Sequence, residues 1–190
     1  MNLGKLGLVA LVLQAVSLGP ALAAAAVDYD DVVVEQREGV YHGNFSLQIA
    51  VPPAVALEVL TDFEHMAEFV PNLSASHIIS RVGNVYRIAQ QGKARFGPLG
   101  FAFESERQIE VLPDGRILSK ALSGSTKYMR SEMRLQASGG GTRLDYRIEM
   151  IPDRWAPALL GVGFLRHELA EQFSALVNEM QRRQANRPIR

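Results

Sequence analysis

The sequence predicts an α+β fold in which a curved antiparallel sheet of about seven strands wraps around a long C-terminal helix, with two short helices after the first main strand. Three observations support this prediction. Apolar and polar residues alternate through the middle of the chain, turn-forming residues recur there at fairly regular spacing, and the C-terminal stretch changes to a helical period. With 190 residues, of which 47% are hydrophobic and 21% charged, the chain suits one globular domain.

Residues 1–23 have the pattern of a secretory signal peptide. A short start containing Lys5 precedes the apolar run Leu6–Leu18, and Ala21-Leu22-Ala23 matches the A-x-A cleavage pattern. This run of about 13 residues is shorter than the roughly 20 that a membrane-spanning helix needs. We therefore expect a single mature domain, residues 24–190, in a periplasmic or secreted location. The alternative is that the segment stays uncleaved as an anchor.

Charge and cysteine content exclude several classes of protein. The chain has 20 basic and 20 acidic residues, and removing residues 1–23 takes away Lys5 and no acid. Such a balanced chain creates no field that attracts nucleic acid, so we expect no nucleic-acid partner. It has no cysteine, which excludes disulfides and lipid attachment through cysteine. The sequence does not indicate an oligomeric state.

The first elements are two strands and a short helix. Val32–Arg37 and Val40–Val51 predict strands separated by a turn at Gly39. Pro52-Pro53 ends the second strand and suits the first turn of a helix, where the missing N–H groups cost little. One face of the second strand is apolar: Tyr41, Phe45, Leu47 and Ile49.

The next segment is apolar but interrupted. A Thr-x-x-Glu pattern starting at Thr61 predicts a capping box and a new helical turn. The turn must end before Pro71, because the residue before a proline avoids helical geometry. Phe63, Met66 and Phe69 make the segment too apolar for an ordinary surface loop. We expect these three residues to line or gate an apolar cavity, and the alternative is that they complete the core.

Residues 82–151 predict an antiparallel meander. In Met129–Leu135 and Leu144–Met150, apolar and charged residues alternate, so one face of the sheet is dry and carries Met129, Met133 and Tyr146. The predicted turns are Gly83-Asn84, Gly97-Pro98, Pro113-Asp114-Gly115, Gly124-Ser125 and Gly139-Gly140-Gly141.

Residues 157–183 predict the long helix that covers this dry face. About 27 residues give a rod of about 40 Å. A straight rod contacts a concave sheet unevenly, so we expect an apolar cavity between them. The apolar stripe of the helix consists of Val162, Leu165, Leu169, Phe173, Leu176 and Met180.

Two stretches resemble a known family. "VPPAVALEVLTDFEHMAEFVPNLSAS" and "GGGTRLDYRIEM" are similar to the START-like (helix-grip, SRPBCC) superfamily, in its polyketide cyclase/dehydrase and coenzyme Q-binding branch. The resemblance extends over residues 40–183. It implies a helix-grip fold and a ligand-binding domain. It leaves the function open, because the superfamily includes lipid and quinone carriers, hormone receptors, aromatases and hydrolase-like enzymes.

One strand places a charge on the dry face. In "FAFESERQIEV", Arg107 has the same phase as Phe101, Phe103 and Ser105. A buried charge is costly unless it is paired or bound to a polar ligand group. We expect Arg107 to orient the head group of an apolar ligand, with Tyr146 as a second polar group. The alternatives are a bulge that returns Arg107 to solvent and a structural ion pair with Glu168. The predicted ligand-binding residues are Phe63, Met66, Phe69, Phe101, Phe103, Arg107, Met129, Met133, Tyr146, Leu165 and Glu168.

Patterns of common catalytic and metal sites are missing from the sequence. The four histidines, His42, His65, His77 and His167, form no metal pattern, and "HELAEQ" lacks the second histidine of a zinc-protease helix. No nucleophile elbow, phosphate-binding glycine loop or cysteine nucleophile is present. We therefore expect no catalytic residue, no metal and no cofactor. The basic tail "QRRQANRPIR" suits the end of a helix, and transient contact with a membrane surface is the alternative.

These observations favour an exported, non-catalytic binding or carrier protein for a hydrophobic small molecule such as a lipid, a fatty acid or a quinone. One alternative is an aromatase/cyclase-type enzyme that uses Arg107, Tyr146 or His65 in the same cavity. Another is an interaction module in which the expected cavity is simply packed core.

Overall fold

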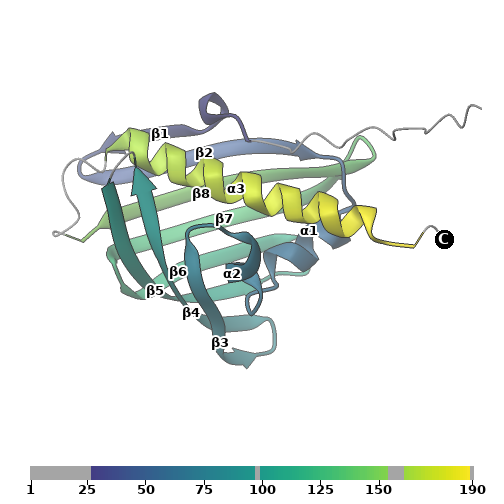
Figure 1. Ribbon diagram of the computed structural model, residues 1–190, viewed down its shortest axis with the longest axis horizontal. Helices are drawn as coiled ribbons and strands as arrows, with labels where there is room; N and C mark the ends of the chain where they lie inside the picture. The colour runs from purple at the N-terminus through teal and green to yellow at the C-terminus, as the bar shows by residue number, and fades with distance from the viewer. Residues whose placement is uncertain (1–26, 97–98, 154–160, 189–190) are drawn as a thin grey trace, which may run out of the picture.

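A computed structural model describes residues 27–96, 99–153 and 161–188. In these residues an eight-stranded antiparallel sheet curves around a long C-terminal helix (Figure 1). The predicted α+β architecture is confirmed, with one strand more than the approximate number expected. The predicted signal peptide, the Gly97-Pro98 turn and the predicted helical residues 157–160 lie outside the described residues. None of the described helices has the length and apolar character that a bilayer span requires.

The strand order is β1-β2-β8-β7-β6-β5-β4-β3, so β3 to β8 form a meander and β2 pairs with the last strand. The strands are β1 (Val33–Arg37), β2 (Val40–Ile49), β3 (Leu73–Val82), β4 (Val85–Phe96), β5 (Leu99–Val111), β6 (Arg116–Gly124), β7 (Thr126–Ser138) and β8 (Gly141–Pro152). The helices are the 3-10 helix η1 (Tyr29–Asp31), α1 (Pro53–Leu60), α2 (Met66–Phe69) and α3 (Val162–Ala185).

The alternation in the sequence sets the two faces of the sheet. In β8 Leu144 and Tyr146 are buried on the concave face, while Arg143 and Arg147 are exposed on the other. The turn between β6 and β7 depends on Gly124, which has φ +115°. A Cβ atom there would collide with the carbonyl oxygen of Glu104, so this turn requires glycine.

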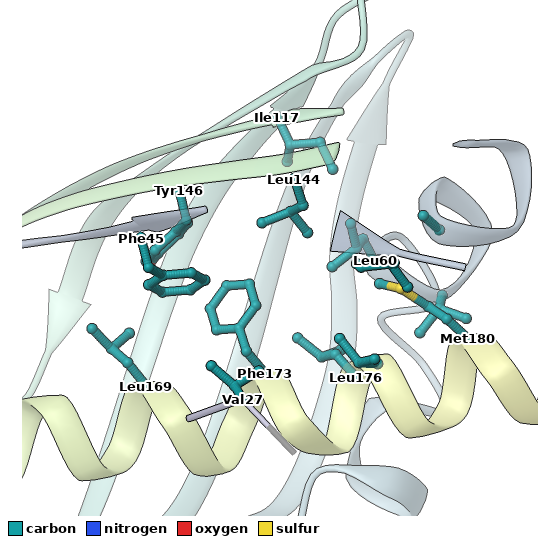
Figure 2. Packing of buried hydrophobic residues seen from close by; sticks show 14 of the residues in the cluster. Val27, Phe45, Leu60, Ile117, Leu144, Tyr146, Leu169, Phe173, Leu176 and Met180 are labelled. Atoms are coloured by element: carbon teal, nitrogen blue, oxygen red, sulfur yellow. The ribbon is translucent and has the colours of Figure 1, made fainter. Parts of the chain in front are cut away.

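Helix α3 packs on the concave face. Its 24 residues correspond to a length of about 36 Å. The Phe173 ring lies 4.6 Å from the ring of Phe45 and 4.8 Å from that of Tyr146, centroid to centroid. Figure 2 shows these three side chains between the sheet and α3, with Leu176 and Met180 further along the helix. Two strands and the helix therefore share one continuous core.

The predicted capping box at Thr61 is wrong. The Thr61 hydroxyl donates to the carbonyl of Leu57 at 2.8 Å and so ends α1. The Glu64 carboxylate instead accepts the backbone N–H of Ile78 at 2.7 Å, beside an irregularity in the pairing of β3. Thr61 therefore bonds to the preceding helix, and Glu64 bonds to a distant strand. These partners compete with the local capping box.

A group of ion pairs fastens the α1–α2 segment to the end of α3. The Arg183 guanidinium donates to Asp62 and to Glu179, both at 2.6 Å, and to Glu58 at 3.3 Å. It also lies 5.7 Å from the centroid of the Phe69 ring. We call Arg183, Asp62, Glu179 and Glu58 the Arg183 cluster.

Two more arginines of the basic tail join the same cluster. Arg182 donates to Glu179 at 2.6 Å, and Arg187 donates to Glu58. Arginines 182, 183 and 187 are therefore paired with acids of the domain itself.

The Arg183 cluster predicts a pH-dependent contribution of His65 to stability. The His65 Nδ1 lies 2.7 Å from the Asp62 Oδ1, and this hydrogen bond and the Asp62 charge raise the pKa of His65. Glu68 acts in the same direction and Arg183 opposes it. A raised pKa in the folded state adds stability that is complete below the unfolded pKa of about 6.5 and is lost as the pH rises through the folded value.

We therefore expect His65→Gln to lower the melting temperature at about pH 5.5 and to leave it nearly unchanged at about pH 8.5. Thermal unfolding followed by circular dichroism measures this difference, with His77→Gln on the exposed side of β3 as the control. A His65→Gln deficit that stays constant or grows with pH would contradict the assignment.

Candidate ligand-binding site

A row of polar side chains crosses the concave face of the sheet. The strand register brings them together. Ser76 is directly opposite Gln90, and Ser119 is directly opposite Ser131. The pairs Gln90 and Arg107, Arg107 and Ser119, and Ser131 and Tyr146 are diagonal neighbours on adjacent strands. We call this row the polar belt. It consists of Ser76 in β3, Gln90 in β4, Arg107 in β5, Ser119 in β6, Ser131 in β7 and Tyr146 in β8.

Both ends of the polar belt are hydrogen-bonded internally. The Gln90 Nε2 donates to the Ser76 Oγ at 3.0 Å and lies 3.3 Å from the Met66 Sδ, while its Oε1 accepts from Arg107. At the other end the hydroxyls of Ser131 and Tyr146 share a hydrogen bond. Burial raises the pKa of Tyr146, so this hydroxyl is neutral.

The middle of the polar belt has unfilled hydrogen-bonding capacity. The Arg107 side chain is half-buried, and its Nε is shielded from solvent and has no hydrogen-bond partner. The Ser119 Oγ, on the neighbouring strand, is also buried without a partner. No carboxylate of the described residues forms an ion pair with Arg107. Burial lowers the pKa of the Arg107 guanidinium. Shielding an unpaired charge in this way costs free energy unless something else binds there.

The register explains why Arg107 points inward. The pairing of β4 with β5 runs without interruption through Ile88 and Arg107. The irregularity lies on the other side of β5, where Leu122 of β6 is skipped in the pairing and is 44% exposed. The bulge therefore belongs to β6, and Arg107 keeps the phase of Phe101 and Phe103.

The expected alternative of an ion pair between Arg107 and Glu168 is wrong. The Glu168 Oε2 accepts a hydrogen bond from the Asn72 Nδ2 at 2.6 Å. Burial raises the pKa of Glu168, and the hydrogen bond from Asn72 partly offsets this. Glu168 therefore belongs to the contact between α3 and the start of β3.

The polar belt divides the concave face into two apolar regions. In the first, which we call the filled end, Ile49, Ile117, Leu135 and Leu144 are buried beside α1. Figure 2 shows Ile117, Leu144, Leu60 and Met180 converging in this region.

The second region, which we call the half-buried end, lies on the other side of the polar belt. Its side chains have the inward phase of their strands, but they are only half-buried: Phe101, Phe103, Ala121, Met129 and Met150 of the sheet, and Val162 and Leu165 of α3. The rings of Phe101 and Phe164 lie 6.2 Å apart, centroid to centroid, and link sheet and helix there. Inward side chains that keep contact with solvent indicate that this end is incompletely filled.

The α1–α2 segment contributes differently from what was expected. Phe63 is 2% exposed, and its ring centroid lies 5.2 Å from that of Tyr86. Phe63 therefore completes the core. Met66 touches the polar belt at Gln90, and Phe69 is half-buried under Arg183. Of the remaining predicted residues, Met133 is half-buried next to Tyr146 on the neighbouring strand.

An enclosed cavity between the concave face and α3 stays a prediction. Two hollows lie at other places on the protein. One of about 520 Å³ is lined mainly by outward side chains such as Lys120, Arg130 and Glu149. Another, of about 250 Å³, lies where β3 and β4 meet α3 and is lined by Pro71, Asn72, Leu73, Ser74, Lys93, Arg95 and Glu171.

Potential metal ligands come together only beside this second hollow in the described part of the chain. His167, Glu168 and Glu171 place ligand atoms within 4.8 Å of one another. Glu168 already binds Asn72, and Lys93 and Arg95 bring positive charge to the same hollow. This arrangement does not by itself define a metal site.

Sequence reasoning missed Ser76, Gln90, Ser119 and Ser131. Each of them is a polar residue in the apolar phase of its strand, which is the signal that identified Arg107. In β6, for example, Ser119 stands between the inward residues Ile117 and Ala121. Their alignment with Arg107 depends on register between strands, which one sequence does not display.

The fold defines the class of protein. A curved antiparallel sheet closed by a long C-terminal helix is the helix-grip architecture of START-like proteins. Residues 43–181 match the family described as "Polyketide cyclase / dehydrase and lipid transport", and the chain belongs to this family. None of the curated proteins compared is similar enough in sequence to match.

Solved structures share the fold at low sequence identity. The Zhui aromatase/cyclase from Streptomyces sp. R1128 has a TM-score of 0.64 and 16% identity, over 76% of this chain and 96% of that one. A START superfamily protein from Mycobacterium smegmatis has a TM-score of 0.64 and 11% identity, over 74% and 97%. A STAR-related lipid transfer protein from Xanthomonas axonopodis has a TM-score of 0.62 and 13% identity, over 80% and 99%.

The unpaired Arg107 predicts that this side chain lowers the stability of the ligand-free protein. We expect Arg107→Met to leave the free energy of unfolding unchanged or to raise it by about 1 kcal/mol, because removing a shielded charge that has no counterion offsets the loss of the hydrogen bond to the Gln90 Oε1. Urea unfolding measures the effect. Arg147→Met, on the exposed face of β8, is the matched control and should change stability by less than about 0.5 kcal/mol. A loss of more than about 2 kcal/mol in Arg107→Met would mark Arg107 as a structural residue.

Proposed function

We propose that this protein is an exported, non-catalytic carrier of a hydrophobic small molecule, of the lipid, fatty acid or quinone class, held between the concave face and α3. The observation that carries the proposal is the half-buried end, where apolar side chains that point inward keep contact with solvent beside the unpaired Arg107 Nε. Membership of a family that includes lipid transport supports it.

An apolar surface is sufficient to bind such a molecule. Burying one methylene group yields about 0.8 kcal/mol, so a chain of about twelve offers about 10 kcal/mol. Association and ordering cost several kcal/mol of this. The remainder still corresponds to about micromolar affinity.

The export part of the proposal rests on residues 1–23, whose short apolar run and A-x-A sequence fit a cleaved signal peptide. An exported carrier would collect its ligand outside the cytoplasm.

The second candidate is an aromatase/cyclase-type enzyme, which the same family also includes. The observation in its favour is the Tyr146 hydroxyl close to Arg107 on one face, where both could hold a carbonyl oxygen. His65 is a poorer candidate for that chemistry, because its side chain is 60% exposed and bonded to Asp62.

Purification of the exported protein under native conditions tests the proposal. We expect native mass spectrometry to give the mass of residues 24–190 with a bound apolar molecule that organic solvent extracts. Met129→Trp, which fills the half-buried end, should lower binding at least about tenfold because it occupies the volume of the ligand.

Leu118→Trp on the opposite face of the sheet is the matched control and should bind like the wild type. Protein that is consistently empty and takes up no offered lipid or quinone would exclude the carrier function. Turnover of a polyketide-like substrate that is lost in Arg107→Ala would support the enzyme instead.

A further inference from the structure

We propose that the ligand is an amphiphilic acid, with its anionic group bound at Arg107 and Ser119 and its apolar part lying over the half-buried end. This inference rests on the proposed function and narrows its ligand class. Three features of the polar belt carry it: its charge, the two free hydrogen-bonding groups at its centre, and the packing on either side.

The first feature is the charge. Arg107 is the only charged member of the polar belt, whose other five side chains are serines, a glutamine and a tyrosine that burial keeps neutral. Neither its neighbour in sequence, Glu106, nor the inward Glu168 of α3 pairs with it. Glu106 has the outward phase of β5 and pairs with Arg87, and Glu168 is held by Asn72. A guanidinium stays protonated in proteins, so one positive charge on the concave face remains uncompensated.

The second feature is the pair of free groups at the centre. The Arg107 Nε–H has no acceptor, and the Ser119 hydroxyl, one diagonal step away on β6, has no partner. Two free donors on neighbouring strands suit the two oxygens of one carboxylate, or two oxygens of a phosphate. A neutral quinone or alcohol oxygen would accept a hydrogen bond there but would leave the charge uncompensated. Hydrogen bonds between ionised partners are about twice as strong as neutral ones.

The third feature sets the direction of the ligand. Ser76, Gln90 and Met66 close one end of the polar belt, and the Ser131–Tyr146 hydrogen bond closes the other. The filled end is packed with buried side chains such as Ile117 and Leu144. An apolar chain attached to a group at Arg107 therefore has one incompletely filled region beside it.

That region is the half-buried end. Its side chains are apolar on both walls: Phe101, Phe103 and Met129 in the sheet, and Leu165 in α3. The acid thus binds with its head group in the middle of the concave face and its chain between the β5–β7 strands and the first turns of α3.

The test compares ligands that share one chain and differ in the head group: dodecanoate, 1-dodecanol and dodecyl phosphate. Each is titrated by displacement of a fluorescent apolar probe at neutral pH. We expect wild-type protein to bind one of the anions at least about tenfold more tightly than the alcohol, and the comparison of the two anions distinguishes a carboxylate from a phosphate. Arg107→Met should abolish the preference and change the affinity for dodecanol far less than the affinity for the anions. Arg107→Lys should keep part of it, and Arg147→Met all of it.

The outcomes separate this inference from the proposed function. Equal binding of dodecanol and both anions by wild-type protein would overturn the acid ligand and leave the carrier function standing. A preference for the anions that survives in folded Arg107→Met would also overturn it. Absence of binding by all three, and by the probe itself, would remove the carrier function with it.

Discussion

A straight helix cannot remain in contact with a curved sheet along its whole length. This constraint determines where side chains pack closely between the sheet and α3 and where they do not. Near α1 the inward side chains, such as Leu144 and Met180, are fully buried, and Phe173 packs on the rings of Phe45 and Tyr146 at the polar belt. On the other side of the polar belt the inward side chains of β5, β6 and β7 are only half-buried. The core therefore stabilises the fold at one end, and the other end is only partly filled by side chains of the protein.

The polar belt lies at the boundary between these regions. Each of its members occupies an apolar phase, which costs stability unless all groups are satisfied. The satisfied members lie at the two ends, and the unsatisfied Arg107 Nε and Ser119 Oγ lie at the centre. A purely structural network would be expected to pair its only charge. The unpaired groups are more consistent with a site that a ligand completes.

Much of the fold could be predicted from the sequence, because it depends on local periodicity. The alternation in residues 144–150 predicted the two faces of β8, and the helical spacing from Val162 to Met180 predicted α3. The inward phase of Arg107 followed from the same rule. The predictions that failed depend on contacts between distant segments. Thr61 and Glu64 match a capping box, but Glu64 binds Ile78. An ion pair between Glu168 and Arg107 was one alternative, but Glu168 binds Asn72, 96 residues earlier in the chain. The polar belt joins six strands, and no single strand reveals its alignment.

The most direct test of the central claim is to observe the Arg107 Nε–H itself. In a ¹H–¹⁵N spectrum of the arginine Nε groups, the Arg107 signal is assigned by its loss in Arg107→Lys. We expect dodecanoate, added to saturation, to shift this signal downfield and to slow its exchange with water, because an unbonded N–H gains a charged acceptor. Dodecanol should affect it far less. An Arg107 signal that stays unchanged while dodecanoate is bound would show that the anion lies elsewhere. This result would contradict binding of the head group at Arg107.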